Sequence, residues 1–167
     1  MKKNYWLIIL ALLVSLFIYL FYRTPKTVVN KIAVYFLTFN KFIACQRYVV
    51  GILPLNKHII YSLPEGLWVF CITLVSKYFF ATVYKRKITL LFFPLVFSIG
   101  LEFFQLFNIT NGRFDFWDIG FSLAGWAAAA YPLKHKNAIH NILHPLTGGS
   151  LICISTYIIV FLAHVCK

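Results

Sequence analysis

Acidic side chains are almost absent from this sequence, in which four Asp and Glu residues stand against sixteen Lys and Arg residues in 167 positions. Charged residues of both signs together make up only 12% of the chain, whereas apolar residues make up 61%. An ordinary water-soluble domain carries about twice this share of charged residues. The composition therefore predicts an integral membrane protein and excludes an ordinary soluble domain.

Cysteine motifs are also missing, because none of the four cysteines lies in a C-x-x-C pair. This spacing predicts neither a zinc framework nor a haem attachment site. His140 and His144 stand four residues apart, a spacing that lets two imidazoles share a metal on a helix, but the sequence offers no third ligand. A solvated cytoplasmic loop is the preferred interpretation of this segment. We therefore expect no metal and no cofactor.

The basic residues lie at the ends of apolar runs rather than in one patch. Lys and Arg at such positions anchor membrane helices and set their orientation. Nucleic acid is therefore not an expected partner. The cluster Lys85–Lys87 predicts a cytoplasmic loop, which places the N-terminus in the cytoplasm of a multi-pass protein of the bacterial inner membrane. In this orientation all four acidic residues lie toward the outer face.

Five apolar runs are about long enough to cross the hydrocarbon core of a bilayer. They lie near residues 4–22, 67–84, 88–107, 117–133 and 149–166. The first run lacks the small residues of a cleavage site, so we expect an uncleaved anchor. No repeat or change of composition divides residues 1–167. The prediction is a single domain of the all-α class, a polytopic membrane helix bundle of about five spanning helices.

Residues 27–55 separate the first two runs and contain too many polar side chains for an ordinary span. Apolar residues such as Ile32, Phe36 and Phe39 nevertheless recur at helical spacing. An amphipathic helix lying in the membrane interface accounts for both observations. A re-entrant segment and a sixth spanning helix remain alternatives.

Three of the four acidic residues fall within residues 99–125. Ionisable groups at membrane depth are costly, so their default interpretation is a functional site. Glu102 and Gln105 are three residues apart and share one face of a helix. Asp118, Ser122 and Gly125 form a similar stripe on the next helix. We expect the two stripes to face each other.

The connection between these helices contains Asn111-Gly112, a pair that favours a turn. Such a turn would bring Arg113 back over the carboxylates, which include Asp115. A small-residue edge formed by Gly120, Ala124 and Ala128 predicts a close approach of neighbouring helices. The fourth acidic residue, Glu65, is expected near the start of the second span for structural reasons, and its contribution to the site is left open.

These motifs resemble those of the VanZ-like family of small bacterial membrane proteins. The resemblance rests on Glu102-x-x-Gln105, then Gly112-Arg113-x-Asp115-x-x-Asp118, then Gly125, and it covers residues 99–125. The chain departs from the family pattern at Ser122, where the family usually has Asn. The resemblance implies a place in the bacterial envelope and an effect on susceptibility to glycopeptide antibiotics such as teicoplanin. It implies no established reaction.

Three interpretations of the polar cluster follow. The first is a structural network in a scaffold or accessory subunit with a membrane protein partner, in which Arg113 neutralises the carboxylates. The second is a ligand site for membrane lipids, a lipid-linked envelope precursor or a glycopeptide, formed by Glu102, Gln105, Arg113, Asp115, Asp118 and Ser122. The third is an enzyme acting on an envelope lipid, with Glu102 and Asp118 as acid and base. Because no known catalytic motif is present, an enzyme is the less favoured of the last two.

Overall fold

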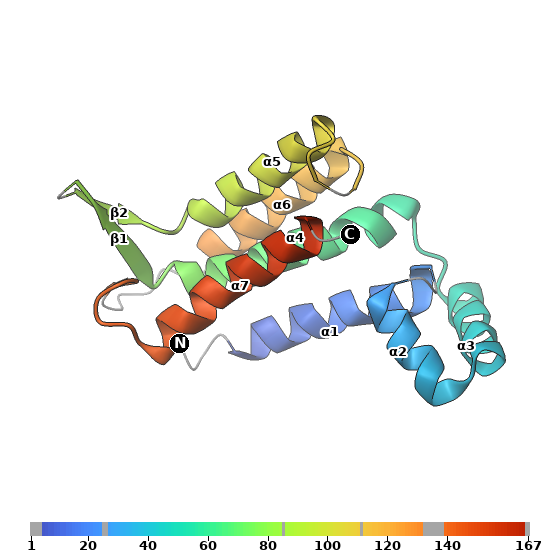
Figure 1. Cartoon of the computed structure of the whole chain (residues 1–167). Coiled ribbons are helices and arrows are strands. Elements are labelled where there is room, and N and C mark those ends of the chain that lie inside the picture. The colour runs from blue at the N-terminus through green and yellow to red at the C-terminus, as the bar shows by residue number, and fades with distance from the viewer. Residues whose placement is uncertain (1–4, 25–26, 85, 111, 132–138, 166–167) are drawn as a thin grey trace.

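The computed structural model describes residues 5–24, 27–84, 86–110, 112–131 and 139–165. Within these residues the chain is mainly helical, with seven helices and a small three-stranded sheet at one end (Figure 1). Two helices are long and apolar enough to cross a membrane, namely α1 (Tyr5–Tyr22) and α4 (Lys57–Ser76). The expected helical bundle is thus present in outline, but the pure all-α class is wrong because of the sheet.

Three further helices correspond to the remaining predicted spans. They are α5 (Phe93–Leu106), α6 (Phe116–Ala130) and α7 (Gly148–Val165). Helices α1, α4, α5, α6 and α7 alternate in direction along the chain, so the connections between them lie at two opposite ends of the molecule (Figure 1). The C-terminal ends of α1, α5 and α7 therefore share one end with the beginnings of α4 and α6.

The predicted helix over 67–84 is wrong at both of its ends. Helix α4 begins at Lys57, because the Asn56 side chain caps it by accepting from the His58 N–H, and Pro64 lies inside the helix. The chain leaves the helix after Ser76 and forms β1 (Phe79–Val83), which pairs with β2 (Arg86–Thr89) in an antiparallel hairpin. These short segments are rich in aromatic and β-branched residues, which favour strands.

The hairpin also shortens the predicted span over 88–107, whose helical part begins only at Phe93. A third strand, β3 (His140–Asn141), runs parallel to β1. His140 is thus in a strand, so a helical pair with His144 is wrong. Buried Tyr78, Phe79, Ile142 and Cys153 form the hydrophobic cluster that joins this sheet to α7. The sheet closes the end of the molecule that lies away from the acidic residues.

Residues 27–55 form two helices rather than one, α2 (Val28–Leu37) and α3 (Phe39–Ile52). The chain breaks between them at Thr38, which has a φ of 61°. Two polar side chains from this region cap the end of α1. The amide of Asn30 donates to the carbonyls of Arg23 and Thr24, and the amide of Gln46 donates to the carbonyl of Leu20. They satisfy carbonyl groups that the end of a helix leaves open.

Helix α4 is the centre of the packing, with α1, α5, α6 and α7 around it. Its closest neighbour is α6, where the two backbones touch at a pair of glycines. A Cβ atom on Gly125 would lie 2.1 Å from the carbonyl oxygen of Gly66. The predicted small-residue edge is wrong, since Gly120 faces open space and Ala124 and Ala128 are exposed. Close approach instead occurs on the stripe that carries Asp118 and Ser122.

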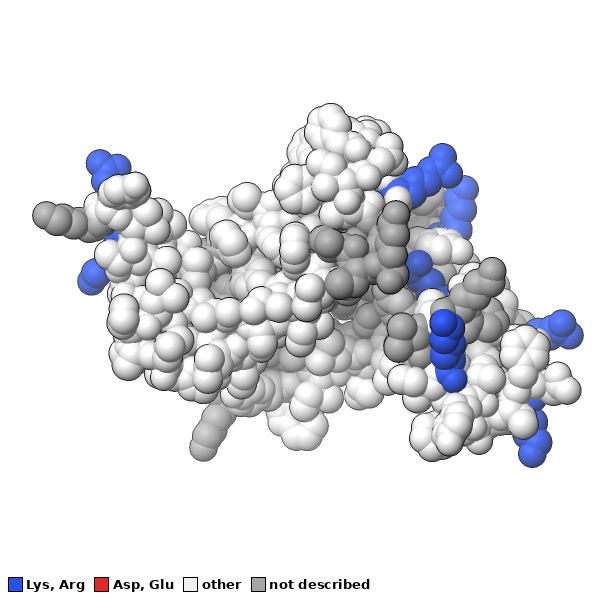
Figure 2. All heavy atoms as spheres, viewed as in Figure 1, with Lys and Arg blue, Asp and Glu red and all other residues white. Residues whose placement is uncertain are grey.

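Basic side chains lie mainly at the two ends of the molecule. Figure 2 shows Lys and Arg near the hairpin at one end and around α2 and α3 at the other, with none among the described residues across the middle of this face. Exposed residues near the hairpin include Arg86 and Lys87, whereas Lys31, Lys41 and Arg47 are exposed on α2 and α3. On this face an uncharged band therefore separates two basic ends.

Candidate functional site

Helix α5 carries a buried polar stripe. Ser98, Glu102 and Gln105 recur at i, i+4 and i+7, and all three are buried even though α5 is otherwise apolar. Glu102 is only 1% exposed. Its Oε2 accepts a hydrogen bond of 3.3 Å from the backbone N–H of Asp115. This contact ties the chain before α6 to the side of α5.

Helix α6 begins at a cap formed by Asp115, whose carboxylate accepts from the backbone N–H of Trp117 at 3.0 Å. Asp118 follows in the first turn, where a carboxylate is favoured by the helix dipole. Ser122, one turn further, is fully buried and lies 2.8 Å from the Ser98 hydroxyl oxygen. Ser98, which the predicted stripe of Glu102 and Gln105 did not include, is therefore the residue of α5 that contacts Ser122.

Glu65 on α4 completes this contact. The Ser98 hydroxyl donates to Glu65 Oε1 at 3.2 Å, so the Ser122 hydroxyl donates to Ser98. The other carboxylate oxygen, Oε2, accepts from the indole N–H of Trp68 at 2.6 Å. We call Ser122, Ser98, Glu65 and Trp68 the inner chain. It connects α6, α5 and α4 by hydrogen bonds within the protein.

A cavity of about 690 Å³ opens beside the inner chain. We call it the acidic cavity. It is lined by Tyr19, Arg23, Tyr61, Glu65, Glu102, Gln105, Gly112, Arg113, Phe114, Asp115 and Asp118. All four acidic residues of the chain are in this set, as are five of the six predicted ligand-binding residues. The sixth, Ser122, is not in the lining and belongs to the inner chain.

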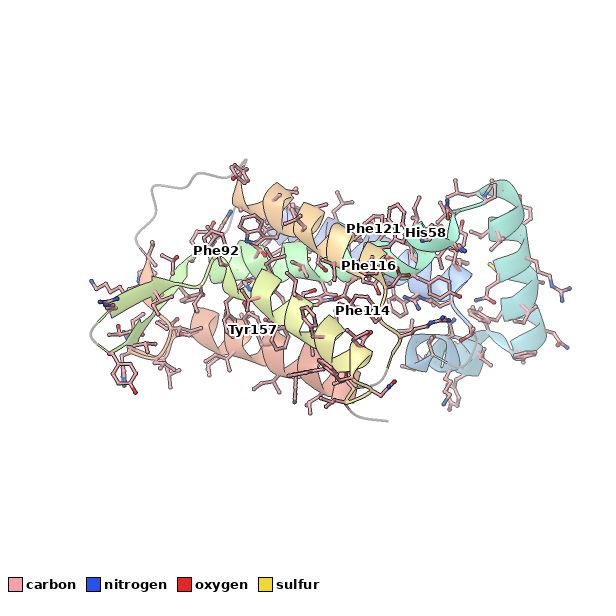
Figure 3. The ribbon with its side chains drawn as sticks, turned by 90° about the horizontal axis from the view of Figure 1, so that it is seen from above. His58, Phe92, Phe114, Phe116, Phe121 and Tyr157 are labelled. Carbon is pink, nitrogen blue, oxygen red and sulfur yellow. The ribbon has the colours of Figure 1, made fainter. Side chains whose placement is uncertain are left out.

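The turn before α6 shapes one wall of the acidic cavity. Gly112 has a φ of +123°, a conformation that a residue with a side chain rarely adopts. A Cβ atom there would also lie 2.8 Å from the Gln105 side chain. Phe114 packs edge-to-face on Phe116, with ring centroids 4.8 Å apart, and Figure 3 shows both rings near the start of α6. The glycine thus allows the loop to fold against α5.

Arg113 is brought to the acidic cavity, as the turn predicts. Its side chain is exposed. Among the described residues, no hydrogen bond is formed by its guanidinium group. Donors of this arginine are therefore available at the cavity wall.

A second arginine, Arg23, also lines the acidic cavity, although the sequence did not predict it as a site residue. Arg23 follows α1, and its guanidinium lies 5.0 Å from the ring centroid of Tyr19 and 4.6 Å from that of Tyr61. One nitrogen, Nη2, donates to the Tyr61 carbonyl at 3.1 Å. In the sequence Arg23 is a basic residue at the end of an apolar run, a position explained by anchoring alone. Its place in the lining of the acidic cavity depends on contacts between distant segments, which no local pattern predicts.

The acidic cavity has an excess of negative charge, because four carboxylates and two guanidinium groups line it. Such a mixed lining suits a ligand that carries donor groups and at least one anionic group. Within the described part of the chain, no three His, Cys, Asp or Glu residues are grouped so as to hold a metal ion.

Fold and site together define a mainly helical protein with two helices long enough to cross a membrane and a polar cavity at one end. Searches against protein-family models, curated proteins and solved structures find no match to this chain. The resemblance to the VanZ-like family stays a prediction from residues 99–125.

Proposed function

We propose that this protein is a VanZ-like, multi-pass protein of the bacterial cytoplasmic membrane that binds a lipid-linked or glycopeptide ligand of the envelope in the acidic cavity. The observation that carries the proposal is the cavity itself. Its volume of about 690 Å³ lies in the usual range for ligand sites, about 300–1,000 Å³. A network that existed only to join helices would instead close its charged groups against one another.

A membrane location is supported by the surface of α1. This helix is apolar along its whole length, yet only Ala11 and Ile18 are buried. Leu10, Leu12 and Leu13 are each more than half exposed. Exposed apolar area costs about 25 cal/mol per Å² in water, and lipid removes this cost. The uncharged band between two basic ends in Figure 2 matches the hydrophobic layer of a bilayer.

The short helices α5 and α6 fit the same proposal. Helix α5 ends at Leu106 and α6 begins at Phe116, and the described residues between them are not helical. Non-helical backbone at membrane depth is tolerated where it lines a cavity or is buried in protein. Residues 112–115 of this connection line the acidic cavity. A wet cavity therefore explains how this connection can lie close to the apolar layer.

Orientation follows from the alternating helices. If the hairpin with Arg86 and Lys87 is cytoplasmic, the opposite end of the molecule, which carries the acidic cavity, faces outward. The N-terminus is then cytoplasmic. An outward cavity would meet envelope lipids and glycopeptides directly, which agrees with the role in teicoplanin susceptibility that the family resemblance implies.

The structural interpretation keeps a specific observation in its favour, which is the inner chain. Its hydrogen bonds join three helices, so this part of the polar cluster contributes to packing. The enzyme alternative retains Glu102 and Asp118, which both line the acidic cavity. Substitution Glu102→Gln distinguishes it, because an enzyme that needs this proton loses turnover while its substrate still binds.

Native mass spectrometry of the purified protein tests the proposal. We compare the wild type with Arg113→Ala at the cavity and with Arg86→Ala on the hairpin, a control that removes the same charge at the other end. The proposal expects a defined envelope lipid on the wild type and on Arg86→Ala, and its loss from folded Arg113→Ala. Equal and unselective lipid on all three proteins would contradict it. Teicoplanin susceptibility of cells expressing each variant then tests the family role.

A further inference from the structure

A second hollow, of about 540 Å³, adjoins the acidic cavity. We call it the α1–α3 groove. It is lined by Phe21, Tyr22, Arg23, Ile43, Gln46, Arg47, Val50, Gly51 and Ile60. Most of the accessible surface of this lining is apolar. Ile43, Gln46, Arg47 and Val50 recur at i, i+3, i+4 and i+7, so a single face of α3 forms one wall.

Arg23 is the residue that the two hollows share. It is held in place from several sides, since its own carbonyl accepts from Asn30, and Tyr19 and Tyr61 lie against its guanidinium. Among the described residues its hydrogen bonding is incomplete, because Nε is buried without a partner while Nη2 reaches the Tyr61 carbonyl. A guanidinium group has five N–H donors and matches phosphate geometry. A fixed arginine with spare donors thus stands between an apolar groove and a polar cavity.

The two hollows differ in the charges of their linings. The α1–α3 groove is lined mainly by apolar surface, and its charged residues are the basic Arg23 and Arg47. The acidic cavity, which shares Arg23, is lined by four carboxylates and, among the described residues, by one further basic residue, Arg113. A ligand that reaches from one hollow into the other past Arg23 would meet complementary surroundings for hydrocarbon, for an anion and for a cation.

We propose that the ligand is an amphiphile with a hydrocarbon chain in the α1–α3 groove, a phosphate at Arg23 and an ammonium group in the acidic cavity. The inference rests on the proposed function and specifies the ligand class of the same site. The chemistry is that of a phosphoethanolamine lipid. Phosphate binds by charge-assisted hydrogen bonds to guanidinium, and the ammonium group takes the excess negative charge among the carboxylates. Helix α3 places the groove at the outer surface layer of the proposed membrane orientation.

Titration by native mass spectrometry with three probes tests each part of this inference. The probes are lysophosphatidylethanolamine with one palmitoyl chain, lysophosphatidylglycerol with the same chain, and glycerophosphoethanolamine, which has the headgroup without a chain. We expect the first probe to bind about tenfold or more tightly than either of the others, a difference of roughly 1.4 kcal/mol or more. Substitution Arg23→Gln should remove most of this affinity.

The groove is tested separately with a matched pair of variants on α3. Val50→Trp places a large ring in the groove, whereas Tyr48→Trp makes the same final residue at an exposed position outside its lining. We expect Val50→Trp to lower the affinity for lysophosphatidylethanolamine to that for glycerophosphoethanolamine. The affinity for glycerophosphoethanolamine itself should not change. Tyr48→Trp should bind all three probes as the wild type does, which also controls for folding.

The contrary outcomes are distinct. Equal binding of glycerophosphoethanolamine and the chain-bearing lipid by the wild type would overturn the role of the groove. Equal or tighter binding of lysophosphatidylglycerol would overturn the proposal that the acidic cavity binds an ammonium group. If no probe binds while a copurified lipid still depends on Arg113, this inference fails and the proposed function stands. If no lipid depends on Arg113 either, both fail.

Discussion

The inner chain and the acidic cavity are both polar and share Glu65, but they differ in where their hydrogen bonds go. In the inner chain, Ser98 and Ser122 are fully buried and bond to each other, and Ser98 continues to Glu65. At the cavity wall, Arg113 is exposed, and its guanidinium group donates no hydrogen bond to the described residues. The hydrogen-bond partners of a polar side chain in a membrane protein therefore indicate whether it packs helices together or is available to bind a ligand. The presence of the side chain alone does not.

The two regions also share a boundary. Glu65 accepts two hydrogen bonds of the inner chain and lines the acidic cavity as well. Glu102 accepts the backbone N–H of Asp115 and lines the same cavity. Rigid support behind a binding site keeps its groups in place and lowers the cost of ordering them when a ligand arrives. The inner chain would supply part of this support, and we expect the loss of one of its hydrogen bonds to lower stability far more than lipid binding.

The largest expected effect concerns the side of the membrane that the acidic cavity faces. Cys45 is exposed on α3, near the cavity end, and Tyr84 is 98% exposed on the hairpin. In intact cells a membrane-impermeant maleimide should label Cys45 and should not label Tyr84→Cys until the inner membrane is opened. The Tyr84→Cys protein also carries Cys45→Ser, so that the two positions are labelled separately. Both proteins carry Cys166→Ser, because that residue lies outside the described part. Labelling of Tyr84→Cys in intact cells would reverse the proposed orientation.

The next effect tests the helix contact on which both regions depend. Gly125→Ala places a Cβ atom 2.1 Å from the backbone oxygen of Gly66, and backbone cannot move aside locally. Overpacking of this kind typically costs about 1–3 kcal/mol, and we expect the upper end or beyond. The measurement is the melting temperature and the folded yield in detergent. Gly120→Ala, which faces open space in the same helix, is the control and should melt no lower than the wild type.

The third prediction concerns Glu102, a residue of the acidic cavity that we expect to affect ligand binding more than helix packing. Glu102→Gln keeps the shape of the side chain and an oxygen that can accept the Asp115 N–H. It removes one carboxyl group from the lining of the acidic cavity, so affinity for an ammonium-bearing lipid should fall by up to about tenfold, or roughly 1.4 kcal/mol. Melting temperature should change little. A large drop in melting temperature with unchanged lipid binding would place Glu102 with the inner chain.

The smallest expected effect concerns a residue of the inner chain that joins helices and does not line the acidic cavity. Ser98→Ala removes the hydroxyl that joins Ser122 to Glu65. Hydrogen bonds between membrane helices contribute about 0.6–2 kcal/mol, so the loss in stability should be of this size. The melting temperature measures it, and lipid retention should remain near that of the wild type. Unchanged melting would show that the inner chain contributes nothing measurable.

Local patterns predicted the parts of the site that lie close in sequence. The spacing of Glu102 and Gln105, the turn at Gly112 and the stripe of Asp118 and Ser122 each follow from helix or turn geometry over a few residues. Their meeting in space needs only one short connection. The placement of Arg113 at the cavity was predictable for the same reason.

The missing parts depend on distant segments or on competing preferences. Arg23 and Tyr61 reach the acidic cavity because α1 packs on α4, and that packing has no local signature. Strands formed at Phe79–Val83 and Arg86–Thr89, where hydrophobicity alone suggested helices, because aromatic and β-branched residues favour a hairpin. The close contact at Gly66 and Gly125 also required knowing which helices are neighbours.

The most direct test measures stability and bound lipid together on Ser98→Ala and Arg113→Ala. Both variants are purified in the same detergent, and native mass spectrometry and melting are recorded on the same samples. Our account predicts opposite results, with Ser98→Ala melting lower while it keeps its lipid, and Arg113→Ala melting as the wild type does while it loses its lipid. If both variants lose stability and lipid together, the inner chain and the acidic cavity are one structural network, and the proposed binding function is contradicted.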